Sequence, residues 1–215
     1  MLITISRQYG AGGSDVAARV AGALGWRVVD NELVERVAAR AGLTPEDVAQ
    51  QEERVSTFIE RLARTVVAAT PELVVPPEAG GTAPLLSEED LVRVTERVVE
   101  EVAAEGRVVL VGRAAPAVLA RERDAIHVKL VAPREWRIRA VIERLGVPTE
   151  EAATLTDETD RNRARYHRQH YQRDWADPAN YHMVLNPAAL GLDGAAEVIV
   201  GRARALGWHP PHMSP

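Results

Sequence analysis

Short apolar runs alternate along the chain with longer segments whose apolar residues recur every three to four positions. MLITIS and RVVLV are runs of the first kind, and DVAARVAGAL, which is followed by Gly25, is a segment of the second kind. Short runs rich in β-branched residues predict strands, and helical spacing that stops at a glycine predicts a capped helix. The predicted strands cover residues 1–6, 26–29, 107–111, 126–131 and 181–185. Helices are predicted over residues 15–24, 32–41, 87–105, 133–145, 149 into the 160s and 193–206, with another beginning at residue 44.

This alternation predicts an α/β fold with a central parallel sheet, right-handed crossovers and helices on both faces. We expect one domain over residues 1–208, because 215 residues with 46% apolar content suit a single core. Within it we expect an insert of helices and loop at about 50–105 and a helical lid at about 149–178. Residues 209–215 are expected to form a disordered tail. Ligands of such sheets bind at the carboxyl ends of the strands, so the loops after Ile5, Val29 and Val111 should face one cleft.

The charge, the cysteine content and the length of the apolar runs limit the kinds of ligand and partner that we expect for this chain. The formal net charge of −5 combines charges of both signs, which does not indicate binding to nucleic acid or to a membrane surface. The absence of cysteine excludes disulfides, thiolate metal sites and a cysteine nucleophile. No apolar run reaches the roughly 18 residues of a membrane helix, and the chain starts without a signal-peptide pattern. We therefore expect a cytoplasmic protein that acts on small molecules.

A glycine-rich loop, SRQYGAGGSD, separates the first predicted strand from the first predicted helix. Backbone N–H groups of such a loop can converge on an anion, and the helix N-terminus adds positive partial charge. The loop therefore predicts a phosphate cradle, with a plain tight turn as the alternative. The candidate donor-binding residues are Arg7, Gly10, Ala11, Gly12, Gly13, Ser14 and Asp15. The hydroxyl group of Ser14 is also the candidate ligand for a magnesium ion (Mg²⁺).

The loop departs from the phosphate-binding pattern G-x-x-x-x-G-K-[ST] at its lysine. Arg7 stands at the first glycine, Gly12 and Ser14 match, and Gly13 occupies the lysine position. That lysine ordinarily reaches the β- and γ-phosphates, so this chain needs another cation or transfers phosphoryl groups slowly. Arg7 is one candidate, and arginines of the lid are the other. We expect the lid to supply most of the charge.

Five segments resemble, in the same order, the cytidylate kinase-like family, whose members are relatives of bacterial CMP kinase. They are ITISRQYGAGGSDVAARVAGALGW, VVDNELVER, VVLVGRAA, DRNRARYHRQHYQRDWADPANY and NPAALGLDGAAEVI. The resemblance spans nearly the whole chain except about residues 50–105. It implies a P-loop kinase-like domain of three layers with a helical lid. It also implies ATP with Mg²⁺ as the donor and a pyrimidine nucleoside monophosphate, CMP or dCMP, as the acceptor.

The resemblance also implies which residues bind the acceptor. These residues are Asp30, Arg36, Arg113, Asp160 and Arg163. Two acids that flank the Gly-Arg pair of CMP kinases are replaced here by Val111 and Ala114. Two other functions therefore stay open, namely a kinase for another small phosphorylated acceptor and a catalytically weak nucleotide-binding or regulatory protein.

The lid segment concentrates positive charge. Arg161 and Arg165, spaced by four, share one helical face, and such a face matches the charge of a phosphoryl group in transfer. The candidate catalytic residues are Arg161, Arg163 and Arg165. The alternative is a solvated helix whose arginines pair with Asp157, Glu158 and Asp160.

Three further positions have predicted roles. Arg137 is expected to flank the adenine or the phosphates of the donor, or else to be an exposed helix residue. His127 and Lys129 alternate within a strand and are expected to be structural residues that face a sheet edge. Trp175 is expected to pack in a turn that ends the lid.

Overall fold

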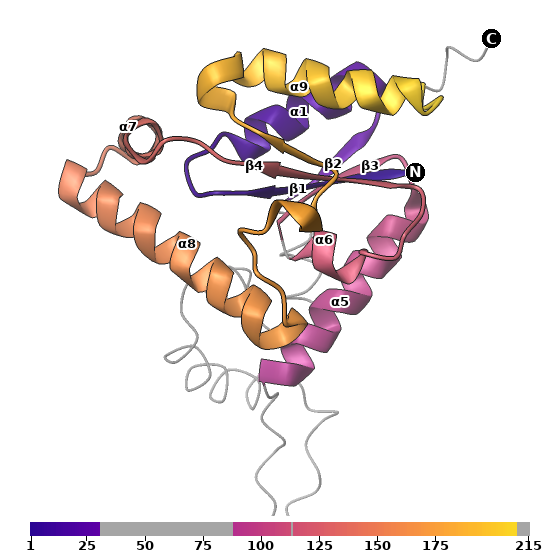
Figure 1. Cartoon of the computed structure of the whole chain (residues 1–215), viewed down its shortest axis with the longest axis horizontal. Helices are drawn as coiled ribbons and strands as arrows, with labels where there is room; N and C mark the ends of the chain where they lie inside the picture. The colour runs from indigo at the N-terminus through magenta and orange to yellow at the C-terminus, as the bar shows by residue number, and fades with distance from the viewer. Residues whose placement is uncertain (31–87, 113, 210–215) are drawn as a thin grey trace, which may run out of the picture.

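The computed structural model describes residues 1–30, 88–112 and 114–209. In this part of the chain five parallel strands form one sheet in the order β2-β3-β1-β4-β5 (Figure 1). The strands are β1 (Leu2–Arg7), β2 (Arg27–Val29), β3 (Val108–Val111), β4 (Ala125–Leu130) and β5 (Met183–Leu185). The predicted α/β class and parallel sheet are confirmed.

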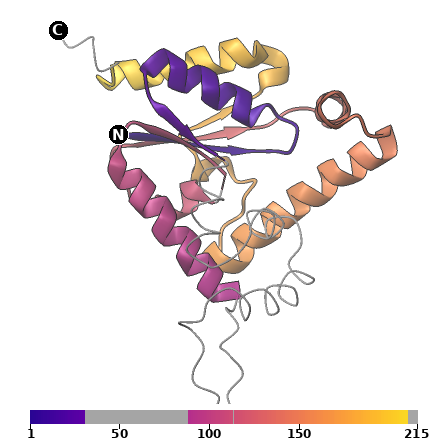
Figure 2. The ribbon, with the colours of Figure 1, turned by 180° about the vertical axis from the view of Figure 1, so that it is seen from behind.

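Helices cover both faces of the sheet (Figures 1 and 2). On one face lie α1 (Gly13–Leu24) and α9 (Pro187–Ala205), and on the other lie α5 (Glu88–Glu105) and α6 (Ala115–Val118). Beyond the carboxyl edge, α7 (Arg134–Leu145) leads into the long helix α8 (Thr149–Tyr171), which runs diagonally toward α5. A 3₁₀ turn, η3 (Pro178–Asn180), precedes β5.

Most predicted boundaries agree with the structure to within two residues, and the exceptions have local causes. Gly25 caps α1 in the left-handed conformation, as its position predicted. Helix α6 was not predicted, because four residues are too few to show a helical period. Helix α9 begins six residues before its predicted start, since Asn186 caps it and the non-helical Gly191 interrupts the apolar spacing.

The strands are apolar on both faces because each face has its own core. Ile3 and Ile5 pack against α1 and α9, whereas Leu2 packs with Leu91 and neighbouring residues on the α5 side. Parallel sheets buried on both faces require such continuous aliphatic runs.

His127 and Lys129 do not face a sheet edge, so that expectation was wrong. They belong to β4, which pairs with β1 on one side and β5 on the other. Both side chains are buried, at 4% and 3% exposure. The very short strand β5 shields β4, and a strand of three residues carries too little pattern to show which neighbour it joins.

The carboxyl ends of β1, β2 and β3 meet at one edge of the sheet. Ile5 lies opposite Val111, and the N–H of Gly112 donates to the carbonyl of Ile5 at 3.0 Å. The insert and the tail, with the predicted helices at 32–41 and after residue 44, lie largely or wholly outside the described residues. In the described part of the chain, no helix combines the length and apolarity needed to cross a membrane.

Candidate functional site

The loop between β1 and α1 is held open by glycines with positive φ. Gly10 and Gly12 both have φ of 76°, a conformation that costs glycine little and other residues much. A Cβ atom at Gly10 would lie 2.7 Å from the carbonyl oxygen of Arg137, and one at Gly12 would lie 2.4 Å from a methyl group of Leu192. The loop therefore packs closely against α7 and α9 while α1 begins at Gly13.

A hollow of about 510 Å³ opens beside this loop. Its size falls within the range of small-molecule sites. Loop residues 7–15 form one wall, and side chains of α7, α8 and α9 form the rest. The residues outside the loop are Trp136, Ala140, Glu143, Arg144, Arg163 and Leu192. We call this space the loop hollow.

Ser14 and Asp30 bring two oxygen groups together at the start of α1. The hydroxyl of Ser14 donates to Oδ2 of Asp30 at 2.6 Å. Asp30 follows β2, so this contact joins two loops at the carboxyl edge of the sheet. A hydroxyl beside a carboxylate offers the hard oxygen ligands that Mg²⁺ prefers. Sequence reasoning linked Asp30 to the acceptor and did not foresee its contact with Ser14.

Arg7 runs across the edge of the sheet from one glycine to another. A Cβ atom at Gly13 would lie 2.7 Å from Cγ of Arg7, and one at Gly112 would lie 2.1 Å from its Nη1 atom. The side-chain stem therefore lies against the start of α1, and the guanidinium lies at the end of β3. An added Cβ atom would meet the stem of Arg7 at Gly13 and the flexible end of the same side chain at Gly112.

A second, much smaller hollow of about 20 Å³ lies beyond Arg7. Its walls come from β1, α6, α8 and the turn after α8. The lining residues are Ser6, Arg7, Gly112, Ala114, Pro116, Arg163, Tyr166, His167 and Trp175. Arg7 and Arg163 line both hollows. The Nη1 atom of Arg163 donates to the carbonyl of Arg7 at 2.9 Å, so α8 contacts the start of the loop.

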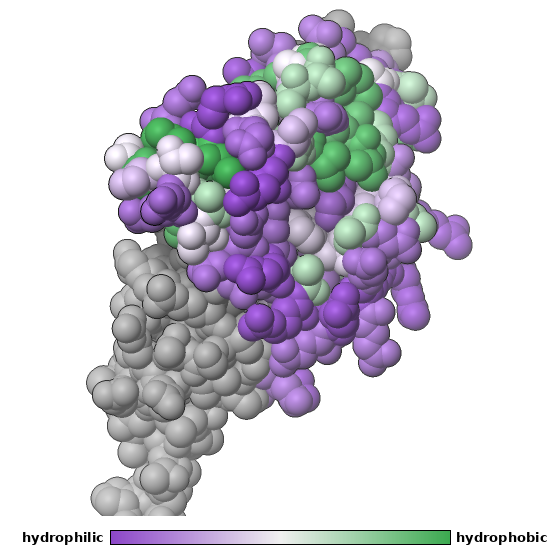
Figure 3. Space-filling view, turned by 60° about the vertical axis from the view of Figure 1, so that its left-hand side comes forward, coloured by the Kyte–Doolittle hydropathy of each residue, from purple (hydrophilic) through white to green (hydrophobic). Residues whose placement is uncertain are grey.

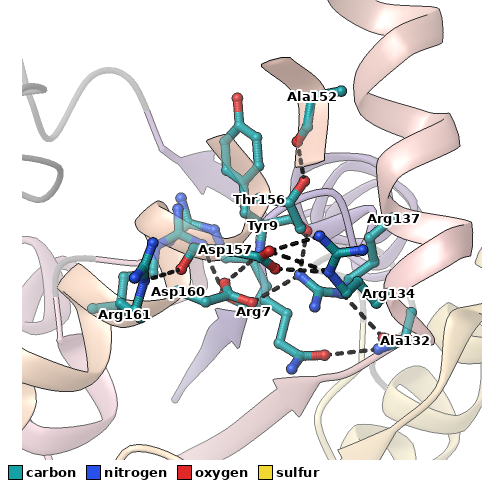
Figure 4. Close-up of polar contacts among 12 residues, drawn as sticks. Arg7, Tyr9, Ala132, Arg134, Arg137, Ala152, Thr156, Asp157, Asp160 and Arg161 are labelled. Atoms are coloured by element: carbon teal, nitrogen blue, oxygen red, sulfur yellow. Dashed lines mark hydrogen bonds and ion pairs between the residues drawn. The ribbon is translucent and has the colours of Figure 1, made fainter. Parts of the chain in front are cut away.

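The three candidate catalytic arginines separate onto two sides of α8. Arg163 faces the hollows, whereas Arg161 and Arg165 are exposed. Arg161 donates from Nε to the carbonyl of Asp157 within its own helix at 3.3 Å (Figure 4).

Figure 3, in which the α7 and α8 side of the molecule comes forward, shows a mainly hydrophilic surface there, with apolar residues gathered nearer the top.

Comparison with known proteins identifies the family of this chain. The sequence profile of the cytidylate kinase-like family matches residues 2–189. The chain belongs to the cytidylate kinase-like family. A cytidylate kinase of Natronomonas pharaonis is 24% identical over 209 residues, which are 95% of this chain and 90% of the relative.

Solved structures share the fold of this family member. An uncharacterized protein from Eubacterium ventriosum superposes with a TM-score of 0.67 at 19% identity, covering 95% of this chain and 98% of the other. Shikimate kinase from Bacteroides thetaiotaomicron superposes with a TM-score of 0.55 at 15% identity, covering 96% and 97%. The chain therefore shares its fold with shikimate kinase.

In this kinase-like chain, Asp160 and Arg137 bind to the loop and to each other (Figure 4). Asp160 accepts the N–H of Tyr9 at 2.8 Å and Nη1 of Arg137 at 2.7 Å. Arg137 also donates to the carbonyls of Tyr9 at 3.0 Å and Ala132 at 3.1 Å. Burial raises the pKa of Asp160, although the Tyr9 N–H and the nearby arginines oppose this shift.

These contacts settle one alternative for Arg137. Its side chain is buried at 6% exposure, so the interpretation as an exposed helix residue was wrong. Sequence spacing could not reveal this, because the partners Tyr9 and Asp160 lie 128 and 23 residues away. A contact of Arg137 with the donor remains a prediction, as does a contact of Asp160 with the acceptor.

Trp175 packs as expected in a turn, which follows α8. It is 6% exposed, and its Nε1 atom donates to the hydroxyl of Ser6 at 2.9 Å. Asp177 then caps η3 through the N–H of Ala179. Arg36 and Arg113, the predicted ligands of the acceptor phosphate, lie outside the described residues, and their roles remain predictions.

Sequence reasoning missed several residues that line the loop hollow, among them Trp136, Arg144 and Leu192. Trp136 and Arg144 lie two turns apart on α7, on the same side as Ala140. This spacing is visible in the sequence, but it is equally typical of any helix face. Leu192 follows the kink at Gly191, which directs it toward Gly12.

Proposed function

We propose that the chain transfers the γ-phosphoryl group of ATP to a pyrimidine nucleoside monophosphate, CMP or dCMP, and releases the nucleoside diphosphate. The observation that carries this proposal is the loop hollow, where a glycine-rich loop and a helix N-terminus border a space of nucleotide size. The cytidylate kinase among the relatives supports the choice of acceptor.

The donor fits the loop hollow by its chemistry. Backbone N–H groups of residues 10 and 12–14 would hold the phosphates, since that of Ala11 donates to the carbonyl of Gln8. The half-buried Trp136 offers an aromatic face to the base. Ser14 and Asp30 would hold Mg²⁺, which neutralises charge on the phosphates when it is bound.

The protein's own contribution to transfer is positioning and electrostatic stabilisation. Arg163 lies between the two hollows and contacts the loop, so it can bear on a phosphoryl group that moves from one to the other. The hollow beyond Arg7 is too small for a nucleotide in this structure. The acceptor therefore requires an opening between α6 and the carboxyl-terminal half of α8, and closure over it would exclude water.

The test combines binding with an acceptor panel. Of the four tryptophans, Trp26, Trp175 and Trp208 are buried at 8% exposure or less, so Trp136 is the one placed to report a ligand in the loop hollow. Mg-ATP should change the intrinsic fluorescence of the parent protein and leave that of Trp136→Phe nearly unchanged. It should also raise the melting temperature of both proteins.

The panel then identifies the acceptor. ATP consumption with CMP or dCMP should exceed that with AMP, GMP or a non-nucleotide acceptor such as shikimate. Turnover with a different acceptor and none with CMP would refute the acceptor assignment. Binding of ATP without transfer to any acceptor would favour a regulatory nucleotide-binding protein, and no binding at millimolar Mg-ATP would refute the donor site.

A further inference from the structure

We propose that Arg7 replaces the missing lysine of the phosphate-binding loop and that Gly13 makes room for it, whereas Gly112 has a φ of 79° that favours glycine in any case. This inference rests on the proposed phosphoryl transfer and names the residue that supplies its positive charge. It links the charge of Arg7 to the glycine that stands at the lysine position, Gly13.

The first observation is the space at Gly13. This residue is the first of α1 and does not have a positive φ, so its backbone does not require glycine. What requires glycine is Arg7, whose Cγ lies 2.7 Å from the position of an added Cβ. A lysine at residue 13 would have to start where the stem of Arg7 already lies. The loss of the lysine and the presence of Arg7 are therefore a single exchange.

The second observation is the position of the guanidinium. Its Nη1 atom lies 2.1 Å from the Cβ position of Gly112, at the end of β3, and the side chain lines both hollows. The group thus lies between the loop that would hold the donor and the two residues Gly112 and Ala114 beside the smaller hollow. A phosphoryl group in transfer passes between such sites, so the positive charge of Arg7 lies where it can stabilise the transition state.

The third observation is that the charge remains available. Among residues 1–30, 88–112 and 114–209, no carboxylate lies within ion-pair distance of Arg7. Its backbone is fixed instead, since Arg7 lies opposite Leu130 in the pairing of β1 with β4 and its carbonyl accepts from Arg163. A guanidinium stays protonated and presents a planar fork of donors that fits phosphate oxygens.

This geometry points away from the lid arginines that sequence reasoning favoured. Arg161 and Arg165 are exposed on the other side of α8, and Arg161 donates to a carbonyl of its own helix. Either would need α8 to rotate before it could reach the loop hollow. Arg7 needs no rearrangement of helices, because it emerges from the loop itself.

A set of loop variants tests the role of Arg7. Arg7→Ala should lower turnover by about 10² or more, because the lost contact is strongest in the transition state. The variant Arg7→Ala/Gly13→Lys restores the usual loop and should recover at least about tenfold of that loss. Gly13→Lys alone should have a lower turnover than the parent, because the lysine and Arg7 would then occupy the same space.

A matched pair of alanine variants tests the space itself. Gly13→Ala adds a single Cβ atom against Arg7, and turnover should fall by about tenfold or more. Gly22→Ala is the control in the same helix, because an added Cβ there meets no atom within 4 Å. Its turnover should stay within about twofold of the parent. Melting temperatures identify any variant that is unfolded, and only the turnover of folded variants is compared.

Binding separates this inference from the proposed function. Arg7 should favour a triphosphate over a diphosphate, so Arg7→Ala should lose most of the preference for a non-hydrolysable ATP analogue over ADP in calorimetry. A parent protein that neither binds nor uses ATP would refute the proposed function. A parent that transfers phosphoryl groups, with a folded Arg7→Ala variant within threefold of its turnover, would overturn the role of Arg7 alone. So would a double variant no more active than Arg7→Ala.

Discussion

Two ion pairs join the same two helices and differ mainly in burial, which allows a controlled test of what holds the loop in place. Arg137 pairs with Asp160 at 2.7 Å, with side-chain exposures of 7% and 16%. One turn earlier on both helices, Arg134 pairs with Asp157 at the same distance, with exposures of 47% and 41% (Figure 4). We predict that Arg137→Met destabilises the protein strongly and that Arg134→Met does not.

The magnitude follows from the atoms left without partners. Arg137 donates to three oxygens, namely the carboxylate of Asp160 and the carbonyls of Tyr9 and Ala132. Removing one partner of a buried ion pair costs about 3–5 kcal/mol, because the other charge stays buried without compensation. For a chain of this size such a loss lowers the melting temperature by about 10 °C. The Arg134 pair is solvated, so its loss should leave the transition close to that of the parent.

Urea denaturation of both variants, followed by circular dichroism, measures the two costs. A double-mutant cycle with Asp160→Asn should then show strong coupling to Arg137, while the cycle of Arg134 with Asp157→Asn should show little. Equal destabilisation by Arg137→Met and Arg134→Met would refute the argument from burial. A folded Arg137→Met variant that binds Mg-ATP as the parent does would show that the loop keeps its shape without this pair.

Three further predictions concern buried titratable groups and one backbone kink. Burial and the neighbouring His182 lower the pKa of His127 to about 4 from 6.5. The unfolded state therefore binds more protons between these two pH values. Acidification to pH 5 should lower the free energy of unfolding of the parent by about 2 kcal/mol, and His127→Asn should not show this loss. Burial lowers the pKa of Lys129 to about 8 from 10.5, so the free energy of unfolding should rise between pH 8 and 10.5 by more in the parent than in Lys129→Met. In α9, Gly191 has φ of 73° and ψ of 163°, a conformation that is strained for any other residue. Gly191→Ala should therefore lower the melting temperature, and Gly201→Ala, which meets no atom within 4 Å, should raise it slightly.

Much of the fold was predictable because its signals are local. Apolar runs marked the strands, and helical spacing closed by a glycine marked α1, since Gly25 caps it in the left-handed conformation. The glycine loop and Ser14 were also visible, because a turn between strand and helix depends on the residues within it. Right-handed crossovers then required the parallel sheet.

The site required the tertiary structure, because its decisive contacts join residues far apart in the sequence. Helical spacing grouped Arg161 with Arg165, and the packing of α8 turned Arg163 toward the hollows instead. Arg137 and Asp160 were candidate ligand contacts, and their burial against Tyr9 showed that they hold the loop.

Arg7 shows most clearly what the sequence determines and what only the tertiary structure determines. The sequence alone determined that the loop lacks its lysine and that an arginine stands at the start of the loop. It did not determine that Arg7 lies between Gly13 and Gly112, because Gly112 reaches this place only through the pairing of β3 with β1. Local sequence sets backbone conformation, whereas the space that a long side chain occupies is set by neighbours that the fold brings together.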